Sequence, residues 1–127
     1  MNGNILIVDD SPILRKAIRK SVVMAGLPAT AIFEAGNGQE ALDLVAKSPF
    51  DVILLDLHMP VMDGEQFATV WSKRPDLKHI MIVVVSTESN VERINRLKAL
   101  GVHTFLPKPF EPEALAKLVK SHFGAAA

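Results

Sequence analysis

The sequence predicts an α/β protein of the (βα)5 type, in which helices cover both faces of a doubly wound, five-stranded parallel sheet. Short apolar runs alternate with amphipathic stretches, and we expect strands at residues 5–8, 30–33, 52–55, 80–85 and 103–106. The first, third and fourth runs are apolar throughout and rich in branched side chains, which is typical of strands buried on both faces. The intervening stretches are long enough for right-handed crossover helices.

The first helix is predicted directly after the first strand. Ser11 is a suitable N-cap, and Pro12 suits the first helical position. Leu14, Ile18 and Val22 then recur every four residues, which places them on one face of the helix.

The other four helices also have start signals. Residues 37–40 resemble a capping box before Ala41, Leu42, Leu44 and Val45, and Asp63 can cap a helix that carries Phe67, Val70 and Trp71. Ser89 and Glu92 form a second capping-box pattern before Ile94, Leu97 and Leu100, and Gly101 ends that helix. Pro112 opens a last helix with Leu115, Leu118, Val119 and Phe123 on its buried side.

Length and composition restrict the class of protein. A chain of 127 residues suits one domain spanning residues 1–127. Fourteen basic and fourteen acidic residues cancel, so the total charge gives no reason to expect direct nucleic-acid binding. The absence of cysteine excludes disulfide scaffolds, cysteine-ligated zinc and thiol nucleophiles. The longest apolar run, residues 80–85, cannot span a bilayer, and residues 5–8 are too short for a signal peptide. We therefore expect a cytoplasmic protein without membrane insertion.

Acidic residues follow two of the predicted strands. Asp9 and Asp10 end the first strand and Asp56 ends the third, while Ser86 ends the fourth and Lys108 follows the fifth. Ligands of open α/β sheets bind beyond the carboxyl ends of the strands. If the first and third strands are neighbours, the three carboxylates meet at one edge of the sheet.

A cluster of three carboxylates needs compensating charge. The acids repel one another, which raises their pKa values. A single Asp at a strand end is more often a solvated residue or a helix N-cap, but this explanation fits three of them poorly. Together, and opposite Lys108, they favour a bound hard cation, and carboxylates completed by water suit Mg²⁺. The histidines have no zinc-like spacing. A carboxylate beside Mg²⁺, an ammonium and a hydroxyl suits phosphoryl transfer, with Asp56 as a nucleophile that forms an aspartyl phosphate.

These residues resemble the receiver domains of two-component response regulators, over about residues 4–123. Four motifs stand in the expected order at strand ends: Asp9-Asp10, Asp56-Leu57-His58-Met59-Pro60 with Asp63-Gly64 after it, Ser86-Thr87, and Lys108-Pro109-Phe110. The resemblance implies a flavodoxin-like, CheY-like fold with strand order 2-1-3-4-5.

The resemblance also implies a role for each site residue. Asp56 would be the phosphoacceptor, Asp10 and Asp56 direct Mg²⁺ ligands, Asp9 a ligand largely through water, and the backbone carbonyl of His58 a further ligand. Lys108 would pair with the phosphoryl oxygens, and the Lys108-Pro109 peptide would be cis.

The switch residues depart from the family's commonest pattern. Ser86, where threonine is frequent, would supply a hydroxyl that swings to the phosphoryl group, and Phe105, where tyrosine is also frequent, would turn inward after it. His58 and Glu88 lie two residues past Asp56 and Ser86 and flank the path of the attacking water in this family. They would tune the lifetime of the phosphoryl group; the alternative is an exposed His58 that uses only its backbone.

The implied function is that of a signalling switch rather than an enzyme. A sensor histidine kinase, a phosphotransfer protein or a small acyl phosphate would phosphorylate Asp56, and the domain would catalyse its own phosphoryl transfer and dephosphorylation. The face of the fourth helix, fifth strand and fifth helix would then change shape for a downstream protein. Met1 and the short tail at residues 124–127 favour a stand-alone receiver, as in chemotaxis, over the receiver of a longer regulator with an output domain.

Three rival functions fit the sequence less well. An aspartate-nucleophile phosphatase of the haloacid dehalogenase kind needs a second Asp at the position of His58. A flavodoxin-like FMN protein needs a hydroxyl- and glycine-rich first loop, where this chain has Asp9-Asp10-Ser11. A degenerate receiver that works without phosphorylation is disfavoured by the complete acid set.

The remaining conspicuous side chains receive structural interpretations. Trp71 is expected to pack in or beside the core. His79, His103 and His122 are scattered and form no metal set, and Met24, Met59, Met62 and Met81 are expected to fill packing space. Arg93, Arg96 and Lys98 are expected to form a solvated helix face that borders the partner surface.

Overall fold

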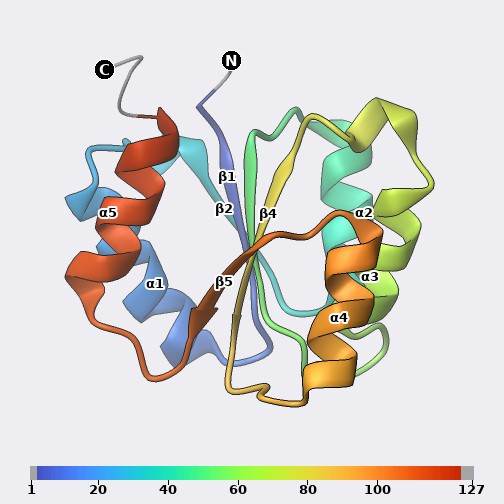
Figure 1. Ribbon diagram of the computed structural model, residues 1–127. Helices are drawn as coiled ribbons and strands as arrows, with labels where there is room; N and C mark the ends of the chain where they lie inside the picture. Colours follow the sequence, from blue (N-terminus) through green and yellow to red (C-terminus); the bar gives the residue numbers. More distant parts are fainter. Residues whose placement is uncertain (1–2, 124–127) are drawn as a thin grey trace.

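The computed structural model describes residues 3–123, with side chains through Ser121, as one five-stranded parallel sheet covered by helices (Figure 1). The strands are β1 (Ile5–Val8), β2 (Ile32–Ala35), β3 (Val52–Leu55), β4 (Met81–Ser86) and β5 (Thr104–Pro107). Their order in the sheet is β2-β1-β3-β4-β5, which confirms the fold expected from the sequence.

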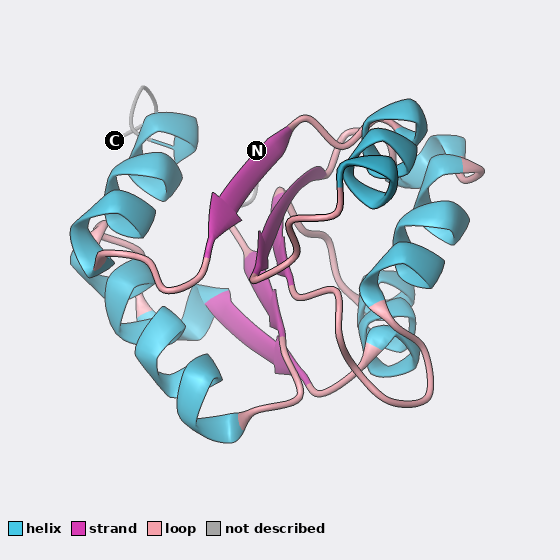
Figure 2. Ribbon diagram, turned by 60° about the horizontal axis from the view of Figure 1, so that its bottom comes forward, coloured by secondary structure: helices cyan, strands magenta, loops and turns pink. Residues whose placement is uncertain are grey.

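The helices lie in two layers. They are α1 (Pro12–Met24), α2 (Gly38–Lys47), α3 (Gly64–Ser72), α4 (Val91–Leu100) and α5 (Pro112–Phe123), with 3-10 turns at Ala29–Ala31 and Pro75–Leu77. Helices α1 and α5 cover one face of the sheet, and α2, α3 and α4 cover the other (Figures 1 and 2). Every residue of β1 and β3 is buried, and successive strand residues pack alternately into the two apolar layers.

Strands β2, β4 and β5 begin later than predicted. Strand β2 begins two residues late, because Pro28 leads into a 3-10 turn that holds Thr30 before Ile32 pairs with Ile5. Strand β4 begins one residue late, because the Ile80 N–H closes a turn onto the Leu77 carbonyl at 3.0 Å. Strand β5 likewise begins at Thr104, after an exposed His103. The one-residue shift of β4 makes Ser86 the last residue of that strand.

Three of the predicted caps form as expected. The Ser11 side chain accepts the Leu14 N–H, and Asp63 forms a reciprocal capping box with Gln66. Gly101, with φ of 109°, ends α4 in the left-handed region that glycine adopts without strain.

The other two capping boxes were predicted wrongly in part. Asn37 caps α2 by accepting the Glu40 N–H. The Glu40 carboxylate, however, accepts the Gly36 N–H and the Asn37 side-chain amide rather than the Asn37 backbone N–H of a capping box. Helix α4 is capped by Asn90 and not by Ser89, because the Glu88 carboxylate accepts the Asn90 N–H and moves the helix start along by one residue.

Side-chain burial follows the predicted helix faces. In α5, Leu115 and Val119 are buried and Leu118 partly so, while the predicted burial of Phe123 lies outside the described side chains, as does His122. Trp71 is buried, as expected, and its indole N–H donates to the Leu77 carbonyl at 2.9 Å. Within residues 3–123, no helix combines the length and apolarity that a bilayer crossing requires.

Candidate functional site

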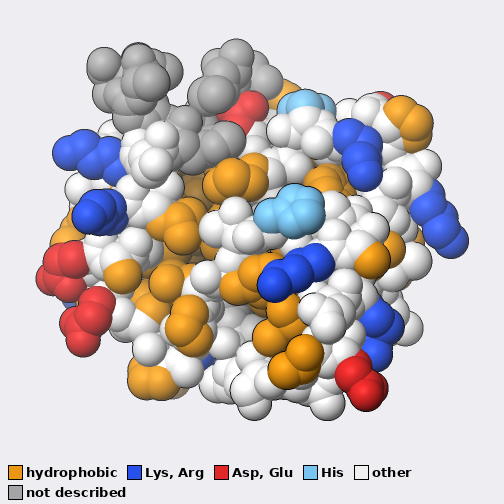
Figure 3. Space-filling view, viewed as in Figure 1, with side chains coloured by type: hydrophobic (Ala, Val, Ile, Leu, Met, Phe, Trp, Pro, Cys, Tyr) orange, Lys and Arg blue, Asp and Glu red, His pale blue; other side chains and the backbone are white. Residues whose placement is uncertain are grey.

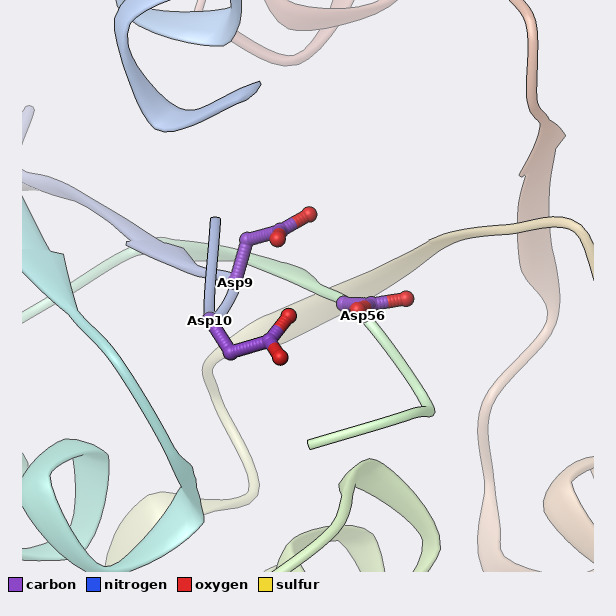
Figure 4. Close-up of side chains that lie close together, drawn as sticks. All are labelled: Asp9, Asp10 and Asp56. Atoms are coloured by element: carbon purple, nitrogen blue, oxygen red, sulfur yellow. The ribbon is translucent and has the colours of Figure 1, made fainter. Parts of the chain in front are cut away.

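Three aspartates meet at the carboxyl edge of the sheet. Asp9 and Asp10 follow β1, Asp56 follows β3, and these strands are neighbours with Val8 opposite Leu55. One carboxylate oxygen from each aspartate lies within 4.8 Å of the other two (Figure 4). Asp9 and Asp56 are buried, whereas Asp10 is exposed. The cluster is therefore open to solvent at Asp10, while the carboxylates of Asp9 and Asp56 are shielded from it.

Backbone hydrogen bonds hold the inner acids in place. The Asp9 N–H donates to the Ala35 carbonyl at 3.1 Å, and the Asp56 N–H donates to the Val8 carbonyl at 2.9 Å, so the sheet ladder continues through both residues. The Ser11 N–H donates to Asp9 Oδ1 and the Leu57 N–H to Asp56 Oδ1, both at 2.9 Å. The following loops thus orient each carboxylate.

Lys108 extends from the end of β5 into the acid cluster. Its Nζ lies 2.9 Å from Asp9 Oδ2 and 3.5 Å from Asp56 Oδ1. Its backbone N–H donates to the Ser86 carbonyl at 3.0 Å, and the Lys108-Pro109 peptide is cis, as predicted. One ammonium against three carboxylates leaves a net negative site.

Burial raises the pKa of Asp56 above its usual value. The charge of Lys108 acts in the opposite direction, while the charge of Asp9 adds to the increase. An ionised Asp56 therefore destabilises the folded protein unless more positive charge arrives.

The donor atoms fit a magnesium ion. All three side chains offer carboxylate oxygen, and Asp10 is exposed, so water can complete an octahedral shell. A divalent cation would also balance the two negative charges that Lys108 leaves uncompensated. No cysteine is present to favour a softer metal.

The loop between β3 and α3 is tightly fastened. The Met62 N–H donates to the Pro60 carbonyl at 2.7 Å, around Val61 with a positive φ of 69°. This is the rarer, strained three-residue turn. The Gly38 N–H of α2 donates to the Met62 carbonyl at 2.8 Å, so α2 holds the turn from outside. The backbone of His58 lies in the same loop.

A cavity separates Ser86 from Phe105. Ser86 is buried, and its Oγ accepts the Glu88 N–H at 3.2 Å. Phe105 is partly exposed, with the Lys98 ammonium 6.0 Å from its ring centroid. The cavity measures about 230 Å³ and is lined by both side chains with Leu57, Val84, Ile94 and Leu106 among others.

The side chain of His58 is not isolated. Its Nε2 lies 3.5 Å from Glu88 Oε1, although 53% of the side chain is exposed. Glu88 in turn lies 3.6 Å from the Arg93 guanidinium. The His58 side chain is thus exposed, as the backbone-only alternative expects, and also has a carboxylate neighbour; both interpretations stay predictions.

The expectation of a solvated α4 face is wrong for Arg93. Its side chain is 23% exposed and lies within 3.6 Å of carboxylates on both Asp63 and Glu65. Arg96 remains exposed but pairs with Glu65 through two hydrogen bonds. These contacts join α4 to α3, and the sequence offered no local signal for them.

Sequence patterns also missed Arg15, whose guanidinium donates to the backbone carbonyl of Asp9 at 2.6 Å. The sequence did contain a signal for this contact: Arg15 lies four residues after Ser11, on the first turn of the helix that follows the acids.

Residues 5–120 match the response regulator receiver domain family. The chain belongs to this family. The receiver resembles the chemotaxis protein CheY4 of Vibrio cholerae at 35% identity, with a TM-score of 0.83 and coverage of 93% of this chain and 96% of that one. It also resembles the signal receiver domain of a signal transduction histidine kinase from Syntrophus aciditrophicus, at 28% identity and a TM-score of 0.85, with coverage of 97% and 91%.

Curated relatives of this receiver are longer proteins. It is 31% identical to the probable transcriptional regulator ycf29 of Porphyra purpurea, covering 95% of this chain and 56% of that protein. It is 34% identical to the transcriptional regulatory protein SrrA of Staphylococcus aureus, covering 95% and 48%. The receiver thus spans about half the length of these two relatives.

Proposed function

We propose that this receiver is a phosphorylation switch in which Asp56 accepts a phosphoryl group in a Mg²⁺-dependent reaction. The observation that carries the proposal is the convergence of Asp9, Asp10 and Asp56 around the Lys108 ammonium. Asp10, Asp56 and the His58 carbonyl would hold the ion, with Asp9 acting largely through water. When bound, Mg²⁺ supplies charge neutralisation for the phosphoryl oxygens.

The transfer needs only one bond exchange. A carboxylate oxygen of Asp56 forms a bond to phosphorus while the bond from phosphorus to the donor breaks, and the donor keeps the electron pair. The donor is a phosphohistidine of a sensor histidine kinase or phosphotransfer protein, or a small acyl phosphate. Water attack on the aspartyl phosphate later resets the switch, so the domain catalyses both steps on itself.

The response begins with the residues around Asp56. Lys108, which already lies between Asp9 and Asp56, turns to the new phosphoryl oxygens, and the Ser86 hydroxyl donates to another. Phe105 then moves into the adjoining cavity of about 230 Å³. This rearrangement changes the face of α4, β5 and α5, where hydrophobic side chains gather (Figure 3). A downstream protein that prefers the changed face reads the signal; a shift of ~10⁴ in the state ratio needs about 5.5 kcal/mol.

Acetyl phosphate provides the simplest test of this function. We expect the protein to gain one phosphoryl group by intact mass when Mg²⁺ is present and none in excess chelator, because the uncompensated carboxylates then repel the donor. Equal labelling with and without Mg²⁺ would contradict the metal's assigned part.

His58 and Glu88 are proposed to tune the lifetime of the phosphoryl group. Their 3.5 Å contact joins the loops that follow β3 and β4, two residues past Asp56 and Ser86. His58→Ala is expected to change the first-order decay of the labelled protein by a few fold, on the order of 1 kcal/mol in the barrier, by opening this approach to water. His79→Ala, which alters another exposed histidine, is the control. Identical decay in both variants and the wild type would leave His58 with its backbone role alone.

We further propose that residues 1–127 act as one receiver unit, in the cytoplasm, by contact with another protein. The likeness to CheY4 over 96% of that protein supports a stand-alone regulator. The longer curated relatives support the alternative, a receiver joined to an output domain. The cysteine-free composition suits a reducing compartment.

A further inference from the structure

Arg15 connects the acidic loop to strand β2. From the first turn of α1, its Nη1 donates to the Asp9 backbone carbonyl at 2.6 Å, and its Nε donates to Glu34 Oε1 at 2.9 Å. The arginine side chain is 19% exposed and that of Glu34 is 31% exposed. The planar guanidinium therefore links the end of β1 to β2 by two hydrogen bonds whose directions are fixed relative to each other.

The carbonyl that Arg15 holds belongs to the peptide that joins Asp9 to Asp10. Because a peptide unit is planar, fixing this oxygen also fixes the N–H of Asp10 and restricts where the two side chains leave the backbone. Asp9 is also held by its N–H bond to the Ala35 carbonyl and, at its carboxylate, by the Ser11 N–H and the Lys108 ammonium. None of these holds the carbonyl oxygen.

We propose that Arg15 is a positioning residue, which sets the Asp9-Asp10 pair in the orientation that binds Mg²⁺. The inference rests on the proposed function, because it assigns a residue to the assembly of that same metal site. In this role Arg15 is no ligand of the ion; it acts through the peptide between the two acids, whose carbonyl it holds.

Arg19 provides a matched comparison one helical turn later. Its Nε donates to the other oxygen of Glu34 at 2.9 Å, and its Nη2 donates to the Ile32 carbonyl at 3.2 Å. Both arginines thus bind the same carboxylate and one backbone carbonyl, but the carbonyl of Ile32 lies at the start of β2, away from the acids.

Glu34 remains available to both arginines at neutral pH. Partial burial raises the pKa of Glu34, but the hydrogen bonds and charges of Arg19 and Arg15 outweigh it and hold the pKa below its usual value. The bracing contact is therefore an ion pair under ordinary conditions.

Position and charge predict opposite effects for the loss of Arg15. If the guanidinium acted only through its charge, removing it would strengthen Mg²⁺ binding, because a positive charge would leave the neighbourhood of the acids. If it positions the Asp9-Asp10 peptide, removing it weakens binding.

The test is calorimetric titration of Mg²⁺ into the unphosphorylated protein, for wild type, Arg15→Gln and Arg19→Gln. We expect Arg15→Gln to bind Mg²⁺ about tenfold more weakly, as is usual when a partner behind a metal ligand is lost, and Arg19→Gln to bind like wild type. The two variants should lose similar thermal stability. With acetyl phosphate, Arg15→Gln should need about tenfold more Mg²⁺ for half-maximal labelling, with a maximal rate near wild type.

Each outcome has a separate meaning. Failure of wild type to bind Mg²⁺ would overturn the proposed function. Binding by wild type, with Arg15→Gln equal to or tighter than Arg19→Gln, would overturn only the role of Arg15. Arg15→Lys keeps the charge but carries its donors on a single nitrogen, so it cannot hold both partners in the two directions of the guanidinium. It serves if the glutamine variant fails to fold; unchanged Mg²⁺ affinity in a folded Arg15→Lys would also overturn the inference.

Discussion

Replacement of Asp56 by asparagine is expected to abolish phosphoryl uptake and, at the same time, to stabilise the metal-free protein. Uptake is lost because a neutral amide at this position, 3.5 Å from the Lys108 ammonium, is a poor nucleophile. Stability rises because the ionised Asp56 carboxylate is unfavourable in the folded protein. Burial raises the pKa of Asp56, the charge of Lys108 opposes this effect, and the charge of Asp9 adds to it. We expect a gain on the order of 1 kcal/mol at neutral pH by denaturant unfolding.

The pH dependence of this gain follows from the direction of the pKa change. A carboxyl group whose pKa is higher in the folded state destabilises the fold while it is ionised, and this cost vanishes as pH falls below the unfolded value. The advantage of Asp56→Asn should therefore be largest near neutral pH and shrink toward pH 3.8, the ordinary pKa of the residue.

Asp51 provides the control for Asp56, because the two buried aspartates flank the same strand, β3. The Asp51 carboxylate accepts the Gly3 N–H at 2.6 Å and lies at the opposite end of the strand from the cluster. Asp51→Asn should leave phosphoryl uptake unchanged and bring no gain in stability. Labelling of Asp56→Asn at the wild-type level would refute the assigned acceptor.

Replacement of Gly64 by alanine is expected to destabilise the protein by about 3 kcal/mol or more, because the new methyl group meets backbone rather than a flexible side chain. A Cβ at Gly64 would overlap the carbonyl oxygen of Asp56 and lie 2.9 Å from the Leu57 Cα. Helix α3 can begin where it does only because this residue has no side chain. A folded Gly64→Ala protein should also bind Mg²⁺ poorly, since the backbone after Asp56 must move.

Gly36 is the matched control for Gly64. A Cβ there would have its nearest neighbour, Glu40 Oε1, at 3.6 Å, which is ordinary van der Waals contact. Gly36→Ala should therefore change the free energy of unfolding by about 0.5 kcal/mol or less. Equal unfolding midpoints for the two alanine variants would show that the close approach at Gly64 has been misjudged.

The sequence predicted strands β1 and β3 better than the edge strand β2, for a physical reason. Strands β1 and β3 are buried on both faces, so their apolar runs begin and end with the strand. Strand β2 lies at the edge and contains an exposed Glu34, and its start is decided by the turn after Pro28. At α4, Ser89 and Asn90 are both good caps, and only the Glu88 contact selects Asn90.

The candidate site was predictable where it depends on strand ends. Asp9, Asp10 and Asp56 converge because β1 and β3 are adjacent and parallel, as the resemblance to receiver domains implied. The bridges made by long side chains were not predictable, because they depend on distances between elements far apart in sequence. Arg15 meets Glu34 across 19 residues, and Arg96 meets Glu65 across 31. Lys108 is the exception, because its place after the fifth strand already led us to expect it opposite the acids.

Borohydride trapping of the labelled wild-type protein tests the central claim most directly. Borohydride reduces an aspartyl phosphate to homoserine, so peptide mass mapping after Mg²⁺-dependent labelling locates the acceptor. We predict homoserine at position 56 and no reduction at Asp9, Asp10 or Asp51. Reduction at another aspartate, or a phosphoryl group that survives borohydride on serine or histidine, would contradict the assignment of Asp56 as the phosphoacceptor.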